Sequence, residues 1–318
     1  MEPPLRSMMD SVGNTVLTIL WIALFVGAML LARHHLRVGR ADRRGATRLA
    51  VFASSTEIAA WIIGYRHTPD VRIELNSLNA ITGDAVLLGL ILWIVYVALE
   101  PYCRRFWPDL LLGSSRLLSG HVRDPRVGRD ILLGVSAGVL WLLLDVGRQL
   151  VPPAMGYPQP LPQLGYVVLQ LPSSAMTLLV WTTGVLRQLI PAFGAVLLLV
   201  VLRLITRRAS VAIAIGMVVT FFWWSSFGAA STWWIELVLE IAIVSLFTFA
   251  MIRFGLLTAT IALFVARIGA ATPFTLHATH WSAAASNWTI VLVGGLAVFG
   301  FYASRGGRFE MWNLGVDG

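Results

Sequence analysis

The residues of this sequence that could do chemistry are ionisable side chains placed inside long apolar stretches. A charge near the centre of a membrane helix costs about 2.5–3.5 kcal/mol on insertion scales, so each one is expected to have a partner or a role. Asp145 and Arg148 are three residues apart and are predicted to pair on one helix face. Glu236 and Glu240 are four residues apart, and Arg267 is the expected partner of Glu236.

These charges have two open interpretations. One is an outward-facing polar cavity between the fourth, seventh and eighth spans. The other is a set of buried ion pairs that fix the register of the helices, with the remaining charges reaching water. The second is favoured because outer-half positions are less costly than the bilayer midplane, where only Glu57 is expected. The residues predicted to form the cavity or the ion-pair network are Asp84, Asp145, Arg148, Glu236, Glu240 and Arg267.

A metal site is the third chemical possibility. His277 and His280 are three residues apart and could share a metal ion with Glu236 or Glu240, as an intramembrane metalloprotease would require. No HExxH motif accompanies them, and the sequence has no phosphate-binding glycine loop and no nucleophile elbow. We therefore predict no catalytic residue, no cofactor and no metal. The single cysteine, Cys103, cannot form an internal disulfide.

The elements that position these residues are predicted to be membrane-spanning helices. The chain has 318 residues, of which 57% are hydrophobic and 13% charged, and its mean hydropathy is +0.77. Soluble domains are about 45–50% apolar and about 25% charged. The sequence thus predicts a single all-α, polytopic transmembrane bundle of about nine spans, at residues 14–32, 49–65, 81–100, 131–150, 189–206, 210–227, 232–252, 254–270 and 287–304.

Arginine sets the expected orientation. All 24 basic residues are arginine, and with nine spans their clusters at 33–48, 104–129, 203–208, 253 and 305–308 fall on one side. The positive-inside rule then places the N-terminus outside and the C-terminus in the cytoplasm, in the cytoplasmic (inner) membrane. Because the net charge of +8 follows the loops, we expect membrane lipids and no nucleic acid as partners.

Two connecting segments have patterns of their own. Residues 108–123 place leucines at helical spacing and are predicted to form an amphipathic helix on the membrane surface. Residues 151–188 are predicted to be an extracytoplasmic or interfacial connection, extended where prolines cluster at 151–164 and moderately apolar at 166–188, where Pro172 and Arg187 break the apolar run. The arginines predicted to face lipid or a partner are Arg33, Arg37, Arg40, Arg43, Arg44, Arg104, Arg105, Arg116, Arg123, Arg126 and Arg129.

Three segments of the basic loops carry recurring motifs. They are LARHHLRVGRADRRGA at 31–46, ALEPY with the following RR and WP at 98–108, and SRLLSG with RDPRVGRD at 115–130. Together they resemble the membrane-embedded C-terminal region of certain bacterial serine/threonine protein kinases, and the later spans resemble it in hydropathy and layout. The glycine-rich loop, lysine, HRD and DFG residues of the kinase domain have no counterpart in this sequence.

The resemblance implies a kinase-associated membrane module, either a stand-alone relative or the membrane part of a longer product. We therefore expect a non-catalytic sensor or anchoring module, with a serine/threonine kinase domain as partner in cis or in trans. The alternatives are a small-molecule transporter that uses an outward-facing polar cavity and the metalloprotease built on His277, His280 and Glu240. The transporter is disfavoured because the chain has no internal repeat.

Overall fold

The protein is a bundle of helices. The computed structural model describes residues 4–64, 67–158, 174–224, 232–272, 274–275 and 283–306, and within these ranges it contains no β-strand. The helices are α1 (Pro4–Val38), α2 (Arg43–Gly64), α3 (Val71–Phe106), the short 3-10 helix η1 (Pro108–Leu111), α4 (Leu112–Leu118), α5 (Pro125–Ala154), α6 (Ser174–Thr206), α7 (Ala209–Trp224), α8 (Trp233–Phe254), α9 (Leu256–Ala271) and α10 (Ala283–Ser304).

Six of the described helices are long and apolar enough to cross a membrane. They contain the segments Thr15–Val38, Val71–Phe106, Pro125–Ala154, Arg187–Thr206, Trp233–Phe254 and Ala283–Ser304. The apolar helices α7 and α9 have 16 residues each, or about 24 Å at 1.5 Å per residue, which is shorter than a bilayer core of about 30 Å. Each of the nine predicted spans overlaps a described helix, and the remaining one of these helices is α2; the crossing of the membrane by all nine stays a prediction.

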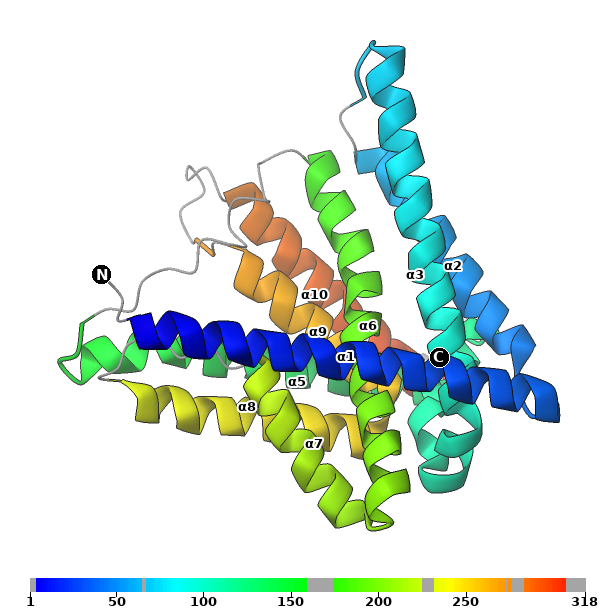
Figure 1. Cartoon of the computed structure of the whole chain (residues 1–318). Helices are drawn as coiled ribbons and strands as arrows, with labels where there is room; N and C mark the ends of the chain where they lie inside the picture. The colour runs from blue at the N-terminus through cyan, green and yellow to red at the C-terminus, as the bar shows by residue number, and fades with distance from the viewer. Residues whose placement is uncertain are drawn as a thin grey trace, which may run out of the picture.

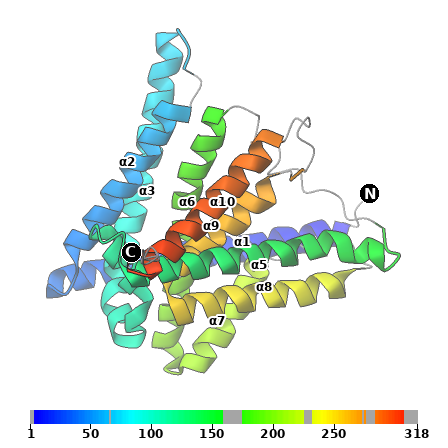
Figure 2. The same cartoon turned by 180° about the vertical axis from the view of Figure 1, so that it is seen from behind.

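The helices converge at one end and spread apart at the other (Figures 1 and 2). Viewed from the end where they converge in Figure 1, α1, α5 and α8 extend to the left, whereas α2, α3 and α6 extend to the top, irrespective of chain direction. The two views agree that the ends of α1 and α3 and the starts of α2 and α5 gather in one region. We call this region the junction end and the other side, where α2 meets α3, the open end.

Contacts between loops hold the junction end together. A Cβ on Gly255, between α8 and α9, would lie 2.8 Å from the backbone oxygen of Leu110, and the φ of +105° at Gly255 favours glycine. A Cβ on Gly300 of α10 would lie 3.0 Å from the backbone oxygen of Gly128, at the start of α5. Arg203, near the end of α6, lies 5.8 Å from the ring centre of Phe106. All five arginine clusters of the sequence therefore have described members at this end.

Helix α9 is the core of the bundle. Thirteen of its residues are buried, because α5, α6, α8 and α10 all pack around it. Helix α5 comes especially close through Gly134 and Gly138, which form the small-xxx-small pattern of closely packed membrane helices. A Cβ on Gly138 would lie 2.6 Å from the Cβ of Val265 and 2.7 Å from the backbone oxygen of Ala262. The α5–α9 contact therefore leaves no space for a larger side chain.

Within the predicted connection at 151–188, the first residues are helical and not extended, and the described end belongs to a helix whose place relative to the membrane stays a prediction. Helix α5 continues through Pro152 and Pro153, because a proline at a helix end still offers its carbonyl, and the backbone N–H of Tyr157 donates to that of Pro152 at 2.9 Å. Helix α6 begins at Ser174 rather than at residue 189. Arg187, which had suggested a break, is tolerated because it pairs with Glu57 of α2 at 3.7 Å. Residues 159–173 lie outside the described part of the chain.

The surface helix predicted at 108–123 is shorter and more buried than expected. It is the pair η1 and α4, and it ends before Gly120, whose φ is +86°. Leu110 and Leu111 are buried in the main apolar core. These leucines therefore pack against the rest of the protein. Their helical spacing indicates a helix face that contacts the protein core and not lipid.

Candidate functional site

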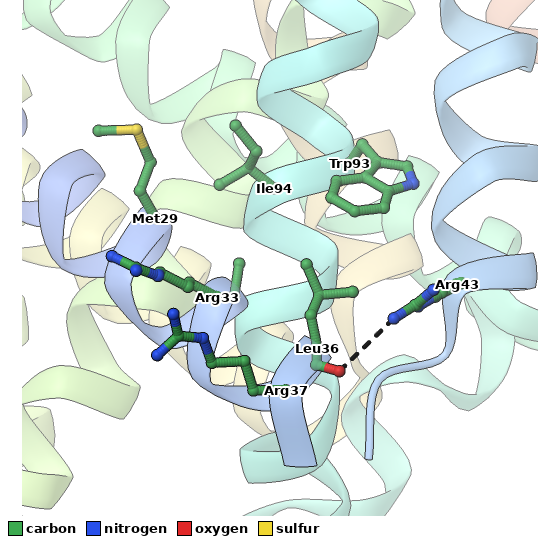
Figure 3. A pocket seen from close by; sticks show the side chains of 8 residues that line it. Met29, Arg33, Leu36, Arg37, Arg43, Trp93 and Ile94 are labelled. Carbon is green, nitrogen blue, oxygen red and sulfur yellow. Dashed lines mark hydrogen bonds between the residues drawn. The ribbon is translucent and has the colours of Figure 1, made fainter. Parts of the chain in front are cut away.

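A hollow lined by arginine lies at the junction end (Figure 3). Its volume is about 390 Å³, and α1, α2 and α3 each contribute to its wall. Figure 3 shows Arg33 and Arg37 side by side on α1, one helical turn apart, and Arg43 of α2 on the far side of Leu36. The residues that line the hollow are Met29, Ala32, Arg33, Leu36, Arg37, Arg43, Trp93 and Ile94.

The three arginines of this hollow are exposed, and none of them forms an ion pair within the described part of the chain. Arg43 makes one long hydrogen bond, from its Nη2 to the backbone oxygen of Leu36 at 3.5 Å. The neighbouring carboxylate, Asp42, is used elsewhere. It accepts from the backbone N–H of Gly45 at 2.9 Å and from the Tyr96 hydroxyl at 3.4 Å. The hollow therefore carries positive charge that no described carboxylate neutralises by an ion pair.

The opposite wall of the hollow is apolar and held in place. The indole Nε1 of Trp93 donates to the Thr47 hydroxyl at 3.2 Å, which orients the ring. Ile94 is half-buried, and Met29 keeps 40% of its surface exposed. Antiparallel packing of α2 on α3 produces this arrangement, since the Thr47–Trp93 contact is followed by a hydrogen bond from Ser54 to the backbone oxygen of Ala85 at 2.8 Å.

Two buried carboxylates lie at the same end, and each pairs with an exposed arginine. The side chain of Glu100 is 5% exposed and is paired with Arg104, whose side chain is 73% exposed. Asp130 is 4% exposed and pairs with Arg129, 55% exposed, at 3.0 Å. The hydroxyl of Thr258 in α9 donates to the backbone oxygen of Asp130 at 3.0 Å. The exposed arginines thus connect the surface of this end to its buried core.

The turn before α5 is fixed by Asp124. This residue caps the helix by accepting from the backbone N–H of Arg126 at 2.8 Å, and it pairs with Arg116 of α4 at 2.5 Å. Partial burial alone would raise the pKa of Asp124, but these hydrogen bonds and the Arg116 guanidinium together hold it below its usual value. Arg123 lines a second hollow of about 460 Å³ beside this turn.

His35 has an unusual environment in the same region. Its side chain is buried, with its ring centre 5.1 Å from that of Tyr102 and 5.5 Å from that of His34. Neither ring nitrogen has a hydrogen-bond partner within the described residues. The backbone oxygen of His35 accepts from the N–H of Arg40 at 3.1 Å, which closes the end of α1.

Away from the junction end, toward the left side of Figure 1, an ion pair joins α5 to α8. Arg148 pairs with Glu240, whose side chain is 3% exposed, and with Asp145 at 3.6 Å. Two helical turns nearer the junction end, Trp141 of α5 packs against Phe247 of α8 with ring centres 6.0 Å apart. The predicted Asp145–Arg148 pair is present, and the Arg148–Glu240 pair is a further contact that joins two helices.

The six predicted network residues do not form one cluster. Asp84 is an exposed residue of α3, on the side of the bundle where Glu57 pairs with Arg187. Glu236 of α8 accepts a hydrogen bond from Thr232 at 3.4 Å, and the predicted Glu236–Arg267 pair stays a prediction. The exposed residue Arg267 acts electrostatically on Asp145.

The predicted metal site falls outside the described residues, because His277 and His280 lie in the range 276–282. Within the described part of the chain, no group of three His, Cys, Asp or Glu residues could hold a metal ion.

The other predicted basic residues lie around the junction end. Arg105 lies over the ring of Phe106, at 5.6 Å from its centre, and Arg126 lies 3.7 Å from Asp109. Arg40 and Arg44 are exposed between α1 and α2.

Sequence reasoning did not assign a role to Asp42, Tyr96, Glu100 or Asp130. Each had a signal, because all four are polar groups next to a basic loop or inside an apolar run. Spacing alone could not pair Asp42 with Tyr96, which are 54 residues apart.

The fold and these contacts define a multi-pass helical membrane protein with an arginine-rich junction end. Comparison with protein-family models, curated proteins and solved structures gives no match for this chain.

Proposed function

We propose that this chain is a non-catalytic sensor or anchoring module of the cytoplasmic membrane, with a serine/threonine kinase domain as its partner in cis or in trans. In this proposal the bundle crosses the membrane nine times, with its N-terminus outside and its junction end in the cytoplasm. The gathering of all five arginine clusters at one end supports this orientation. The three motif segments of the sequence support the choice of partner.

One observation carries the sensing role: two exposed arginines are the ion-pair partners of two buried carboxylates. Any partner that engages Arg104 or Arg129 takes a counter-charge from Glu100 or Asp130. An unpaired buried carboxylate is costly, so the helices that carry it must then shift or admit water. By the same coupling, a change in helix packing started by a lipid or ligand at the open end alters how these arginines are presented.

Phosphorylation of the kinase partner tests this role. The variants Arg104→Gln and Arg129→Gln are compared with Arg207→Gln and Arg208→Gln, which change exposed arginines of the α6–α7 turn. We expect the first pair to change the phosphorylation level and the second pair to leave it unchanged. Equal effects of both pairs, or no effect of either, would contradict the sensing role.

The size of the native product tests the partner. With a C-terminal tag at the chromosomal locus, a band larger than 34.9 kDa by a kinase domain supports a partner in cis. A 34.9 kDa product that crosslinks to a kinase in intact cells supports a partner in trans. A product of 34.9 kDa that crosslinks to no kinase contradicts both.

A transporter is the second candidate, favoured by the buried Arg148–Glu240 pair between two apolar helices. Intramembrane ion pairs of this kind often lie on substrate or proton pathways. Solute uptake or efflux that is lost in Glu240→Gln would support it, and transport that does not depend on Glu240 would remove it.

A further inference from the structure

The geometry of the arginine hollow points to a ligand: we infer that it binds the headgroup phosphate of one acidic phospholipid, whose acyl chain begins against Met29 of α1 and Ile94 of α3. The inference rests on the membrane-embedded orientation proposed above and is independent of the kinase partner. Three guanidinium groups around one hollow, with no carboxylate paired to them in the described chain, attract an anion.

Phosphate is the anion that best fits this lining. Guanidinium groups bind phosphate oxygens through paired N–H donors, which a lysine ammonium cannot do. Arg33 and Arg37 lie side by side, one turn apart on α1, so both can reach one phosphate, and Arg43 of α2 adds positive charge from the other side of Leu36.

The apolar wall favours a lipid over a free phosphate ion. Met29 and Ile94 line the hollow beside the arginines, and hydrocarbon is the natural neighbour of such a wall in a membrane. The hollow also lies at the depth expected for a headgroup. On the N-terminal side of Arg33, α1 exposes the apolar side chains of Ile19, Ile22, Val26 and Leu30, with 61%, 60%, 43% and 62% of their surfaces free. On its C-terminal side, α1 ends within six residues.

Trp93 supports the same depth. Tryptophan concentrates at the boundary between hydrocarbon and headgroups, where its ring is apolar and its N–H is hydrogen-bonded. The indole N–H of Trp93 already donates to Thr47, so its ring is held beside the arginines. The hollow thus offers cationic groups for the headgroup and apolar groups for the first part of an acyl chain.

The test counts lipids bound to the full chain by native mass spectrometry in a neutral detergent. The probes are long-chain phosphatidylglycerol, phosphatidylcholine, a six-carbon-chain phosphatidylglycerol and inorganic phosphate. The test variant is Arg33→Gln/Arg37→Gln/Arg43→Gln. The control variant is Arg123→Gln/Arg207→Gln/Arg208→Gln, which removes the same charge from exposed positions of other junction-end loops.

We expect one tightly bound phosphatidylglycerol in the native chain and in the control variant. Each basic residue near an anionic lipid contributes a factor of about five, so the test variant should bind about 100-fold more weakly. Phosphatidylcholine and the short-chain lipid should bind more weakly to the native chain than the long-chain probe. All three arginines are exposed, so the test variant should keep the thermal unfolding midpoint of the native chain.

Three results would overturn the inference. Equal weakening in the test and control variants would mean that only general surface charge matters. Inorganic phosphate that binds as tightly as the lipid, with the same dependence on the three arginines, would identify a site for a soluble anion. Equal binding of phosphatidylcholine would remove the requirement for an acidic headgroup. None of these results bears on partner phosphorylation, so failure of this inference is distinct from failure of the proposed function.

Discussion

Replacing Arg148 by glutamine should destabilise the bundle more than any change at an exposed arginine. Glu240 is 3% exposed, and Arg148 is the ion-pair partner that the described residues give it. Removing one partner of a buried pair costs about 3–5 kcal/mol, because the other charge is left uncompensated. At about 2–4 °C per kcal/mol, Arg148→Gln should lower the unfolding midpoint by about 6 °C or more.

The reverse substitution should cost less. After Glu240→Gln, the Arg148 side chain still has Asp145 at 3.6 Å and is itself 20% exposed. We therefore expect a loss of about 1–3 kcal/mol, the usual range for one unsatisfied buried group. In the double variant Arg148→Gln/Glu240→Gln, two neutral amides face each other. Its loss should be smaller than the sum of the single losses by at least about 1 kcal/mol.

Thermal unfolding in detergent, measured at one fixed heating rate, gives these values for all three variants, with Arg208→Gln as the control. A midpoint of Arg148→Gln within 1–2 °C of the control corresponds to a loss of only about one-half kcal/mol by the same conversion. This result would refute the reasoning, since it would mean that Glu240 finds another partner or water. Strictly additive losses would also refute it, because they would show that the two side chains do not interact.

Three further predictions concern packing, protonation and access. Gly138→Val should cost about 1–3 kcal/mol in thermal unfolding by overpacking the α5–α9 contact, whereas Gly147→Ala on the same helix, where a Cβ has 3.8 Å of room, should be tolerated. The hydrogen bond to the Glu74 carboxylate raises the pKa of His67 in the folded chain. The stabilisation from this contact is therefore full below the pKa of His67 in the unfolded chain, about 6.5, and is lost as the pH rises through its pKa in the folded chain. NMR titration should show a lower pKa for His67 in Glu74→Gln. Cys103 is 1% exposed and should react with a maleimide only after unfolding, so rapid labelling of the folded chain would contradict its burial.

The sequence was sufficient for the all-helical class and for the approximate places of the long helices. Apolar length located segments that overlap helices of the described chain, and the spacing of Asp145 and Arg148 predicted their pair. It was misleading at Pro152, which looks like a helix breaker, and at Arg187, which interrupts an apolar run. A proline in a last turn loses few hydrogen bonds, and the charge of Arg187 is matched by Glu57 on another helix.

Contacts between distant segments could not be predicted from one sequence. Arg148 and Glu240 are 92 residues apart, and any of several carboxylates had the right depth to pair with Arg148. The hollow is a similar case. Its arginines were predicted to face lipid or a partner, but part of its apolar wall comes from Trp93 and Ile94 of α3, and the packing of α3 on α1 decides where that part lies. A closer search for small residues at a spacing of four would have found Gly134 and Gly138.

The most direct measurement is the sidedness of the junction end in intact cells that produce the chain. In a Cys103→Ala background, single cysteines replace Thr68 at the open end and Arg123 or Arg207 at the junction end, all three being exposed positions. A membrane-impermeant maleimide should label the cysteine at position 68 in intact cells and those at positions 123 and 207 only after permeabilisation. Labelling at position 123 or 207 in intact cells would contradict a cytoplasmic junction end, and with it the proposed sensing module.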